Sequence, residues 1–264
     1  MTKRKAQEGA GGHTVEERIR RGRLKLFLSL LHEEVTVLRA LSGGPNSASP
    51  ARQIYQCLIA LVRPPTLWLK WELQGLSGAQ FVCIPRLGLL REATRRAREN
   101  EAKFGPGLWM EFGVFEGESL RAISAETEST VYGLDSFEGL PSSWGPGHPR
   151  GTFRVRGRIP SFPQNVKLVP GLFAETLPHL LQGLVESRAS FVHVDCDLYS
   201  GAKTALHGLE SYLQEGSVVV FDEFCGLLPD DEARAFREFL RARGCSFRYL
   251  DVSSHGAVSV EIGP

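Results

Sequence analysis

The sequence predicts an α/β fold in which a mainly parallel sheet is covered by helices. From Gly107 onward, short apolar runs of strand length alternate with helical patterns. This alternation is typical of a doubly wound parallel sheet, in which helices connect successive strands. The chain then ends in two runs, over 247–251 and 257–262, joined by a segment short enough for a hairpin. Together these observations predict a seven-stranded sheet with a C-terminal antiparallel hairpin.

The composition of the 264 residues is that of a globular protein, with 42% hydrophobic and 23% charged residues. The formal net charge of +1 gives no global field that would attract nucleic acid or a membrane surface. No apolar run reaches the roughly 18 residues needed to span a bilayer, and the polar N-terminus lacks the apolar core of a signal peptide. We therefore expect neither a nucleic-acid partner nor a membrane span.

The five cysteines are an odd number and form no CxxC pair. This spacing predicts neither a zinc site nor a disulfide framework. Reduced thiols are typical of cytosolic proteins, so a cytoplasmic location is expected.

Three regions are expected along the chain. Residues 1–13 are polar and Gly-rich, which predicts a disordered tail. Residues 14–104 are interpreted as a helical extension, because Thr14 and Glu17 have the spacing of a capping box and apolar residues then recur at helical intervals. Residues 105–264 contain the alternating strands and helices and form the main domain.

The elements of the main domain follow from the apolar runs and their periods. Strands are expected over 108–112, 131–135, 166–169, 191–195 and 218–221, before the two terminal strands. Helices are expected over 119–126, 173–184, 203–213 and 230–243, and an Arg-rich helix over 86–100 precedes the first strand. This order of elements is that of a parallel sheet.

Acidic pairs follow two of the apolar runs. One run leads through His193 to Asp195 and Asp197, and the next strand is followed by Asp222 and Glu223. Because carboxylates a few ångström apart repel each other, a cation or a proton is expected between them. The sequence therefore predicts a cation site at one edge of the sheet, although Asp197 could instead cap a helix or form a salt bridge. His193 lies inside a strand and is expected to be a hydrogen-bonded core histidine rather than a ligand.

A glycine-containing turn joins the first strand to the first helix. It runs from Glu111 through Gly113 and Gly117 to Ser119, with the spacing ExGxxxG. Glycines let the backbone turn tightly and approach a ligand, whereas a dinucleotide-binding turn has the spacing GxGxxG. Glu111 in this turn suits a cationic or amine-bearing ligand. The alternative is a tight turn with a structural role only.

Asp135 ends the second strand, 18 residues beyond Gly117. An acid at the tip of this strand can accept hydrogen bonds from both ribose hydroxyls of a nucleoside. A helix cap or an Asx-turn is the alternative. Together, Glu111 and Asp135 predict a nucleoside-binding end of the sheet.

Five motifs occur in the order found in one known enzyme family. They are Glu111-Phe-Gly113-Val-Phe-Glu-Gly117, Leu134-Asp135-Ser136-Phe137-Glu138-Gly139-Leu140-Pro141, Gly171-Leu-Phe173-Ala-Glu175-Thr176-Leu177-Pro178, His193-Val-Asp195-Cys-Asp197-Leu-Tyr199-Ser200 and Phe221-Asp222-Glu223. With these motifs the chain resembles the TylF/macrocin O-methyltransferase family over about residues 107–225. The resemblance implies the Rossmann-like fold of class I methyltransferases, S-adenosylmethionine as the methyl donor, and magnesium-dependent methylation of sugar hydroxyls.

The resemblance also implies a role for each matching residue. The cofactor-binding residues that it implies are Glu111, Gly113, Gly117, Ser119, Asp135, Ser136, Phe137, Phe173 and Asp195. Asp195, Asp222 and Glu223 would hold Mg²⁺, although the family often has Asp at the position of Glu223. Asp197 would be the general base that takes the proton of the acceptor hydroxyl as the methyl group arrives.

The segment between Glu138 and Gln164 is long and rich in Gly and Pro, which predicts a functional loop. We expect it to form a lid over cofactor and acceptor. Its arginines could hold an anionic group such as a nucleotide diphosphate. They are Arg150, Arg154, Arg156 and Arg158. The alternative is a solvated basic loop.

Two functions are compatible with these patterns. The first is an S-adenosylmethionine-dependent, Mg²⁺-dependent O-methyltransferase that acts on a hydroxyl of a small molecule, either a glycoside or a related metabolite. The second is a catalytically silent methyltransferase fold that serves a protein partner, which Trp68 and Trp71 in the helical extension favour. The retained acids favour the enzyme. Apolar helices outside the main domain also make a homodimer an expected assembly.

Overall fold

The structure is a computed structural model of the 264-residue chain. It describes residues 80–81, 85–144, 147–157, 159–224, 231–253 and 256–264. The predicted tail over 1–13, residues 14–79 of the predicted helical extension and Arg158 of the predicted lid lie outside these residues. No helix within the described ranges is long and apolar enough to cross a membrane.

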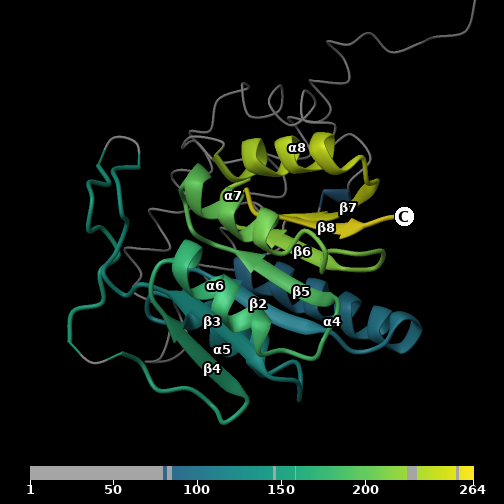
Figure 1. Cartoon of the computed structure of the whole chain (residues 1–264), viewed down its shortest axis with the longest axis horizontal. Coiled ribbons are helices and arrows are strands. Elements are labelled where there is room, and N and C mark those ends of the chain that lie inside the picture. Colours follow the sequence, from purple (N-terminus) through teal and green to yellow (C-terminus); the bar gives the residue numbers. More distant parts are fainter. Residues whose placement is uncertain (1–79, 82–84, 145–146, 158, 225–230, 254–255) are drawn as a thin grey trace, which may run out of the picture. The chain divides into compact units, whose positions relative to one another are not determined.

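An eight-stranded sheet forms the centre of the described domain (Figure 1). Its strands are β1 (Gln80–Phe81), β2 (Leu108–Phe112), β3 (Val131–Asp135), β4 (Val166–Pro170), β5 (Ala189–Val194), β6 (Val218–Phe221), β7 (Phe247–Val252) and β8 (Val258–Ile262). Their order across the sheet is β1-β7-β8-β6-β5-β2-β3-β4. Strand β8 is antiparallel to both β6 and β7, and the other strand pairs are parallel. The predicted mainly parallel sheet with its C-terminal antiparallel hairpin is confirmed.

Strand β1 is an addition to the seven predicted strands. It contributes only Gln80 and Phe81, which pair in parallel with Asp251 and Val252 of β7 at the edge of the sheet. A run of two residues shows no period, so the sequence pattern placed it in the helical extension. The sheet therefore has eight strands, and residues 80–81 belong to it.

Helices cover both faces of the sheet. Their bounds are Arg86–Phe104 for α4, Glu118–Ser124 for α5, Phe173–Gln182 for α6, Tyr199–Gly208 for α7 and Asp231–Arg243 for α8. Helices α4 and α5 share one buried core with the sheet, and α6, α7 and α8 share the other. Helix α4 buries Leu89, Leu90 and Ala93 in the first core. It is therefore part of the sheet domain, although the sequence placed it in the helical extension, because its apolar stripe is covered by the sheet.

Side chains alternate between the two faces along each strand. This alternation determines the face of the sheet on which Glu111 and His193 lie. In β2, Trp109 belongs to the core under α4 and α5, whereas Met110 belongs to the core under the other helices. Glu111 follows Met110 and therefore lies on the α4 face. In β5, His193 lies on the same face as Phe191, which also packs under α4 and α5. Glu111 and His193 are register partners in neighbouring strands, so the fold brings them together.

The strand order reverses between β2 and β5. From β2 the chain continues outward to β3 and β4, and it then returns to β5 on the opposite side of β2. In open α/β sheets, ligands bind in the crevice beyond the carboxyl ends of the strands at such a point. The carboxyl ends of β2, β5 and neighbouring β6 are therefore the place to search for a site.

Aromatic contacts hold α8 against the sheet. Phe236 of α8 is fully buried, and its ring centroid lies 4.9 Å from that of Phe221 in β6 and 5.2 Å from that of Phe247 in β7. Helix α8 also carries a buried acid, Glu232, on the turn before Phe236. The position of α8 therefore affects the carboxyl edge of the sheet.

The substitution Phe236→Ala should lower the free energy of unfolding by about 3–5 kcal/mol, because it removes a buried ring and leaves a cavity. Phe153→Ala is the control, since the Phe153 ring is 39% exposed and much of it is in contact with water in the folded state. Denaturant unfolding followed by circular dichroism measures both changes. Equal losses of stability would contradict the role assigned to Phe236.

Candidate active site

Acidic residues meet at the carboxyl edge of three parallel strands. Glu111 is in β2, Asp195 and Asp197 follow β5, and Asp222 and Glu223 follow β6. Strand β5 lies between β2 and β6 and is parallel to both. Because parallel strands end at the same edge, the structure brings these predicted acids together.

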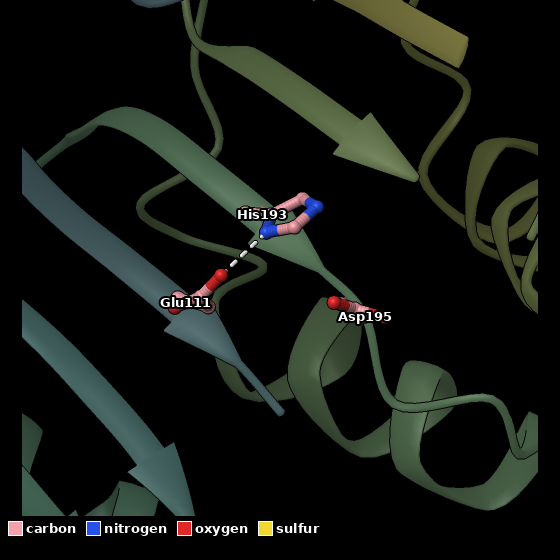
Figure 2. A group of neighbouring side chains, drawn as sticks. All are labelled: Glu111, His193 and Asp195. Atoms are coloured by element: carbon pink, nitrogen blue, oxygen red, sulfur yellow. Dashed lines mark hydrogen bonds and ion pairs between the residues drawn. The ribbon is translucent and has the colours of Figure 1, made fainter. Parts of the chain in front are cut away.

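A buried hydrogen bond joins Glu111 to His193 (Figure 2). Nδ1 of His193 lies 2.7 Å from Oε1 of Glu111, and both side chains are fully buried. Nε2 of His193 has no hydrogen-bond partner and lies 3.9 Å from Oδ1 of Asp222. Burial lowers the pKa of His193, but Asp222 and Glu111 raise it more strongly, to about 10. His193 is therefore a buried histidine that is hydrogen-bonded through one ring nitrogen, and its positive charge lies between two acids.

Arg86, the first residue of α4, lies between Asp195 and Asp222. Its Nε donates a hydrogen bond to Oδ1 of Asp222 at 2.6 Å, and its Nη2 donates one to Oδ2 of Asp195. The Arg86 side chain is 30% exposed, and those of Asp195 and Asp222 are 21% and 14% exposed. Burial lowers the pKa of Arg86, but the two carboxylates outweigh burial and raise it above its usual value. The cation between these acids is a guanidinium, which could not be predicted from the sequence because Arg86 opens a helix rich in arginine.

The surroundings separate the pKa values of the clustered acids. Burial raises the pKa of Asp222, but Arg86 and His193 outweigh burial and lower it below its usual value. Burial, and then the neighbouring Asp222, raise the pKa of Asp195. The same two causes raise the pKa of Glu223 to about 8. Asp222 is thus the acid that is most firmly held as a carboxylate.

Asp197 combines a strained backbone with a shifted pKa. Its φ of +63° lies in the left-handed region, where the Cβ crowds the backbone. Burial and then the nearby Asp222 raise the pKa of its carboxyl to about 7. Helix α7 begins at Tyr199 without a side-chain cap, so Asp197 does not cap it. Strain of this kind is concentrated at functional sites, where the surrounding structure holds it in place.

The predicted metal ligands suit Mg²⁺ by donor type but not by position. Carboxylate oxygens are the ligands that Mg²⁺ prefers, yet Arg86 occupies one oxygen of Asp195 and one of Asp222. Within the described ranges, the residues whose ligand atoms lie within 4.8 Å of one another are Glu111, His193 and Asp195. The Asp195–Asp222–Glu223 set is not gathered at that spacing, so it stays a prediction and no chemical step is assigned to an ion here.

Glu232 of α8 ties the two acidic loops together. Its Oε1 accepts a hydrogen bond from the backbone N–H of Cys196 at 3.3 Å, and its Oε2 accepts one from that of Glu223 at 3.1 Å. The side chain is fully buried, and burial raises its pKa well above the usual range. Sequence reasoning missed Glu232 because a glutamate in the first turn of a charged helix is typical of a solvated position.

Asp135 holds the turn that follows β2. Its Oδ2 accepts hydrogen bonds from the backbone N–H groups of Val114 and Phe115, both at 2.8 Å. Its Oδ1 accepts one from the N–H of Phe137 at 2.7 Å, which is the Asx-turn alternative considered above. Each carboxylate oxygen has a further lone pair, so the structure is compatible with the predicted ribose contact, which stays a prediction.

The two predicted cofactor-site glycines have structural reasons to be glycine. Gly113 has a φ of +94°, and a Cβ there would lie 1.8 Å from the backbone oxygen of Asp195. Gly117, the N-cap of α5, has a φ of +76°, and its Cβ would meet the Phe162 ring at 2.3 Å. The turn after β2 therefore packs directly on the loop after β5.

The remaining predicted cofactor residues surround the same turn. Ser119 is buried in α5, and the hydroxyl of Ser136 accepts a hydrogen bond from the N–H of Glu138 at 3.2 Å. Phe173 opens α6, with its ring centroid 5.2 Å from that of Phe112 in an edge-to-face contact. These positions are compatible with the predicted cofactor roles and do not test them.

The predicted lid has no helix or strand in its described residues. Leu140 and Thr152 pair through a backbone hydrogen bond of 2.8 Å. The Phe153 ring lies edge-to-face against Phe115 of the turn after β2, with centroids 5.7 Å apart. Arg154 forms an exposed ion pair with Glu138 at 2.8 Å, and Arg150 and Arg156 are exposed. The lid therefore contacts the predicted cofactor turn, whereas Arg150, Arg154 and Arg156 are solvated.

Comparison with known proteins identifies the fold and the domain. Residues 110–224, from β2 to just beyond β6, match a family model described as a methyltransferase domain. This part of the chain has the fold of a methyltransferase domain. The match supports an enzyme with methyltransferase activity, as predicted. No curated protein matches the chain significantly, and the finer resemblance to the TylF/macrocin family stays a prediction.

Solved structures share the fold of the described domain. The O-methyltransferase NovP matches with a TM-score of 0.53 and 19% identity, over 68% of this chain and 80% of NovP. CalS11, a calicheamicin methyltransferase, matches with a TM-score of 0.56 and 23% identity, over 83% of this chain and 97% of CalS11. At these identities the likeness shows a common fold, and it confirms the class I methyltransferase architecture predicted from the sequence.

Gly113→Ala should destabilise the methyltransferase domain by more than about 3 kcal/mol, because backbone strain is added to a clash with the Asp195 oxygen. Gly151→Ala is the matched control, since its φ is +85° but no atom lies within 4 Å of its Cβ. We expect only the strain of about 1–2 kcal/mol in the control. Thermal unfolding compares the two variants, and equal losses would show that the close approach at Gly113 is unimportant.

Proposed function

We propose that the domain transfers a methyl group from S-adenosylmethionine to a hydroxyl oxygen of a small molecule, a glycoside or a related metabolite. The observation that carries this proposal is the position of Asp197, whose strained backbone holds a carboxyl at the switch-point edge of the sheet. The printed names of NovP and CalS11 support the same chemistry, since the first is called an O-methyltransferase and the second a calicheamicin methyltransferase.

The residues at the carboxyl end of β2 suit the cofactor. Oε2 of Glu111 is buried without a hydrogen-bond partner, which is an unfavourable state that an ammonium group would relieve. We assign Glu111 to the amino group of the methionine part and Asp135 to the ribose hydroxyls. The bound cofactor would supply an electrophilic methyl group on a positively charged sulfur. The acidic edge favours a ligand of that charge.

Asp197 would act on the acceptor. As the methyl carbon bonds to the acceptor oxygen, the bond to sulfur breaks and the hydroxyl proton passes to the carboxylate of Asp197. A base is most effective when its pKa is near the working pH, and burial together with Asp222 raises the pKa of Asp197 to about 7. Burial and the neighbouring Asp222 therefore make Asp197 a stronger base than an exposed aspartate.

The resemblance adds magnesium to this proposal, with Asp195, Asp222 and Glu223 as ligands. The structure does not support magnesium binding at these residues, because Arg86 is hydrogen-bonded to two of the three acids. The roles given to Glu111, Asp135 and Asp197 do not depend on an ion. The cytoplasmic location and the homodimer also stay predictions.

S-adenosylmethionine should bind the purified chain in isothermal titration calorimetry, and Asp135→Asn should weaken the binding by about tenfold or more, because a charged acceptor of hydrogen bonds is lost. Asp251→Asn in strand β7, far from the β2 and β3 ends in the strand order, is the control and should bind as the wild type does. Asp135→Asn must retain its melting temperature closely enough to be folded at the temperature of the titration. Absence of binding, or equal binding by Asp135→Asn, would contradict the proposed cofactor site.

The value of kcat/KM for methyl transfer to a panel of glycosides should rise with pH and level off above about 7, because Asp197 accepts a proton only as a carboxylate. Asp197→Asn should lower kcat by about 100-fold or more and abolish this rise. Transfer of labelled methyl groups measures both. A variant that keeps full activity would exclude Asp197 as the base, and cofactor binding without transfer to any acceptor would favour the silent binding module.

The melting temperature of Asp197→Asn is the control, because the substitution should raise stability while it lowers activity. The folded pKa of about 7 lies above the ordinary 3.8, so the stability contributed by protonated Asp197 is lost as pH rises between these values. Asp197→Asn should therefore melt at a higher temperature than the wild type at pH 8. A lower melting temperature would mean that loss of activity reflects loss of folding.

A further inference from the structure

Arg86 makes a contact that neither the proposed methyl transfer nor the family resemblance requires. It comes from the start of α4, 109 residues before Asp195 and 136 before Asp222 in the chain, and it bonds to both. The two nitrogens used are Nε and Nη2, which lie on one edge of the planar guanidinium. A fork of this kind holds two carboxylates in fixed positions, as a single ammonium group cannot.

The charges at this position explain why a cation is needed. Asp195 and Asp222 are mostly buried, and each raises the cost of ionising the other unless positive charge lies between them. His193 contributes to this from the interior side of the edge, since its Nε2 lies 3.9 Å from Oδ1 of Asp222. Arg86 contributes from the α4 side. The oxygen Oδ1 of Asp222 thus faces both cations.

A divalent ion would require the same oxygens. Mg²⁺ binds carboxylate oxygens at about 2.0–2.1 Å in a near-octahedral shell. Oδ2 of Asp195 and Oδ1 of Asp222 are the atoms that Arg86 uses, and a guanidinium left in place would lie within a few ångström of the ion. Like charges at such distances repel strongly in a half-buried site. The acid pair can therefore hold Arg86 or a divalent ion, but not both.

We propose that Arg86 is the resident cation of the Asp195–Asp222 pair and that a divalent metal ion can bind there only when Arg86 leaves. The inference deepens the proposed function, on which it rests for the meaning of the acid pair. Arg86 is a positioning residue in this scheme, because it fixes the acids that surround Asp197. Its side chain is 30% exposed, so it can swing toward solvent without unfolding α4.

The test is metal binding, followed with Mn²⁺ by electron paramagnetic resonance on the full-length chain without cofactor or acceptor. Arg86→Gln removes the positive charge, and we expect it to bind Mn²⁺ at least about tenfold more tightly than the wild type, because the ion no longer displaces a salt bridge. Arg95→Gln is the matched control. Arg95 lies on the same helix but pairs with Glu92 and Glu99 on the exposed surface, so its loss should leave Mn²⁺ affinity unchanged.

Two further variants show whether the gain in Mn²⁺ affinity arises at the acid pair, and they keep the test valid if one variant misfolds. Asp222→Asn added to Arg86→Gln should abolish the gain, since it removes a shared ligand. Arg86→Lys keeps the charge but loses the fork, and it should bind Mn²⁺ more tightly than the wild type and more weakly than Arg86→Gln. Circular dichroism checks the fold of each variant. If Arg86→Gln does not fold, the Mn²⁺ affinity of Arg86→Lys decides the outcome.

The outcomes separate this inference from the proposed function. Equal or weaker Mn²⁺ binding by folded Arg86→Gln and Arg86→Lys would overturn the exchange of cations, as would a gain that survives Asp222→Asn. Neither result depends on methyl transfer, because no cofactor or acceptor is present. Conversely, a failure to bind S-adenosylmethionine would overturn the proposed function and leave the competition between Arg86 and the metal ion standing.

Discussion

The balance of charge at the carboxyl edge of the sheet is the constraint on which the rest of the site depends. Carboxylates in a half-buried cluster repel each other strongly, because little water screens them. Two cations built into the fold compensate this repulsion. His193 lies between Glu111 and Asp222, and Arg86 lies between Asp222 and Asp195. Asp222 is shared by both cations, which explains why its pKa is lowered while those of Asp195, Asp197 and Glu223 are raised.

The fold provides this balance from both faces of the sheet. The register of β2 and β5 sets Glu111 opposite His193 on the face that α4 covers, and the first residue of α4 is Arg86. From the other face, α8 inserts Glu232, which accepts hydrogen bonds from the backbones of both acidic loops. One helix thus supplies charge and another fixes the loops. A parallel sheet makes this possible because its strand ends meet at one edge.

Elements and site residues that follow from a local sequence pattern could be predicted. Residues that act through contacts with other elements could not. Runs of apolar residues predicted all seven longer strands, and the acids after β5 and β6 follow directly from where those strands end. Arg86 and Glu232 were missed because each acts through contacts far along the chain. Nothing near Arg86 distinguishes it from the other arginines of α4, and Glu232 has the spacing of a solvated helix residue. Strand β1 is too short to show a period.

The identity of the cation at Asp195 and Asp222 also bears on the proposed base. Asp222 raises the pKa of Asp197, and Arg86 acts in the opposite direction. With Arg86 in place, burial and Asp222 outweigh its effect, and the pKa of Asp197 stays at about 7. A doubly charged ion in the same place would hold a proton off Asp197 more strongly and make it a weaker base. Arg86 therefore does more than fill the position of a cation, because its single charge lowers the pKa of the proposed base Asp197 less than a divalent ion there would.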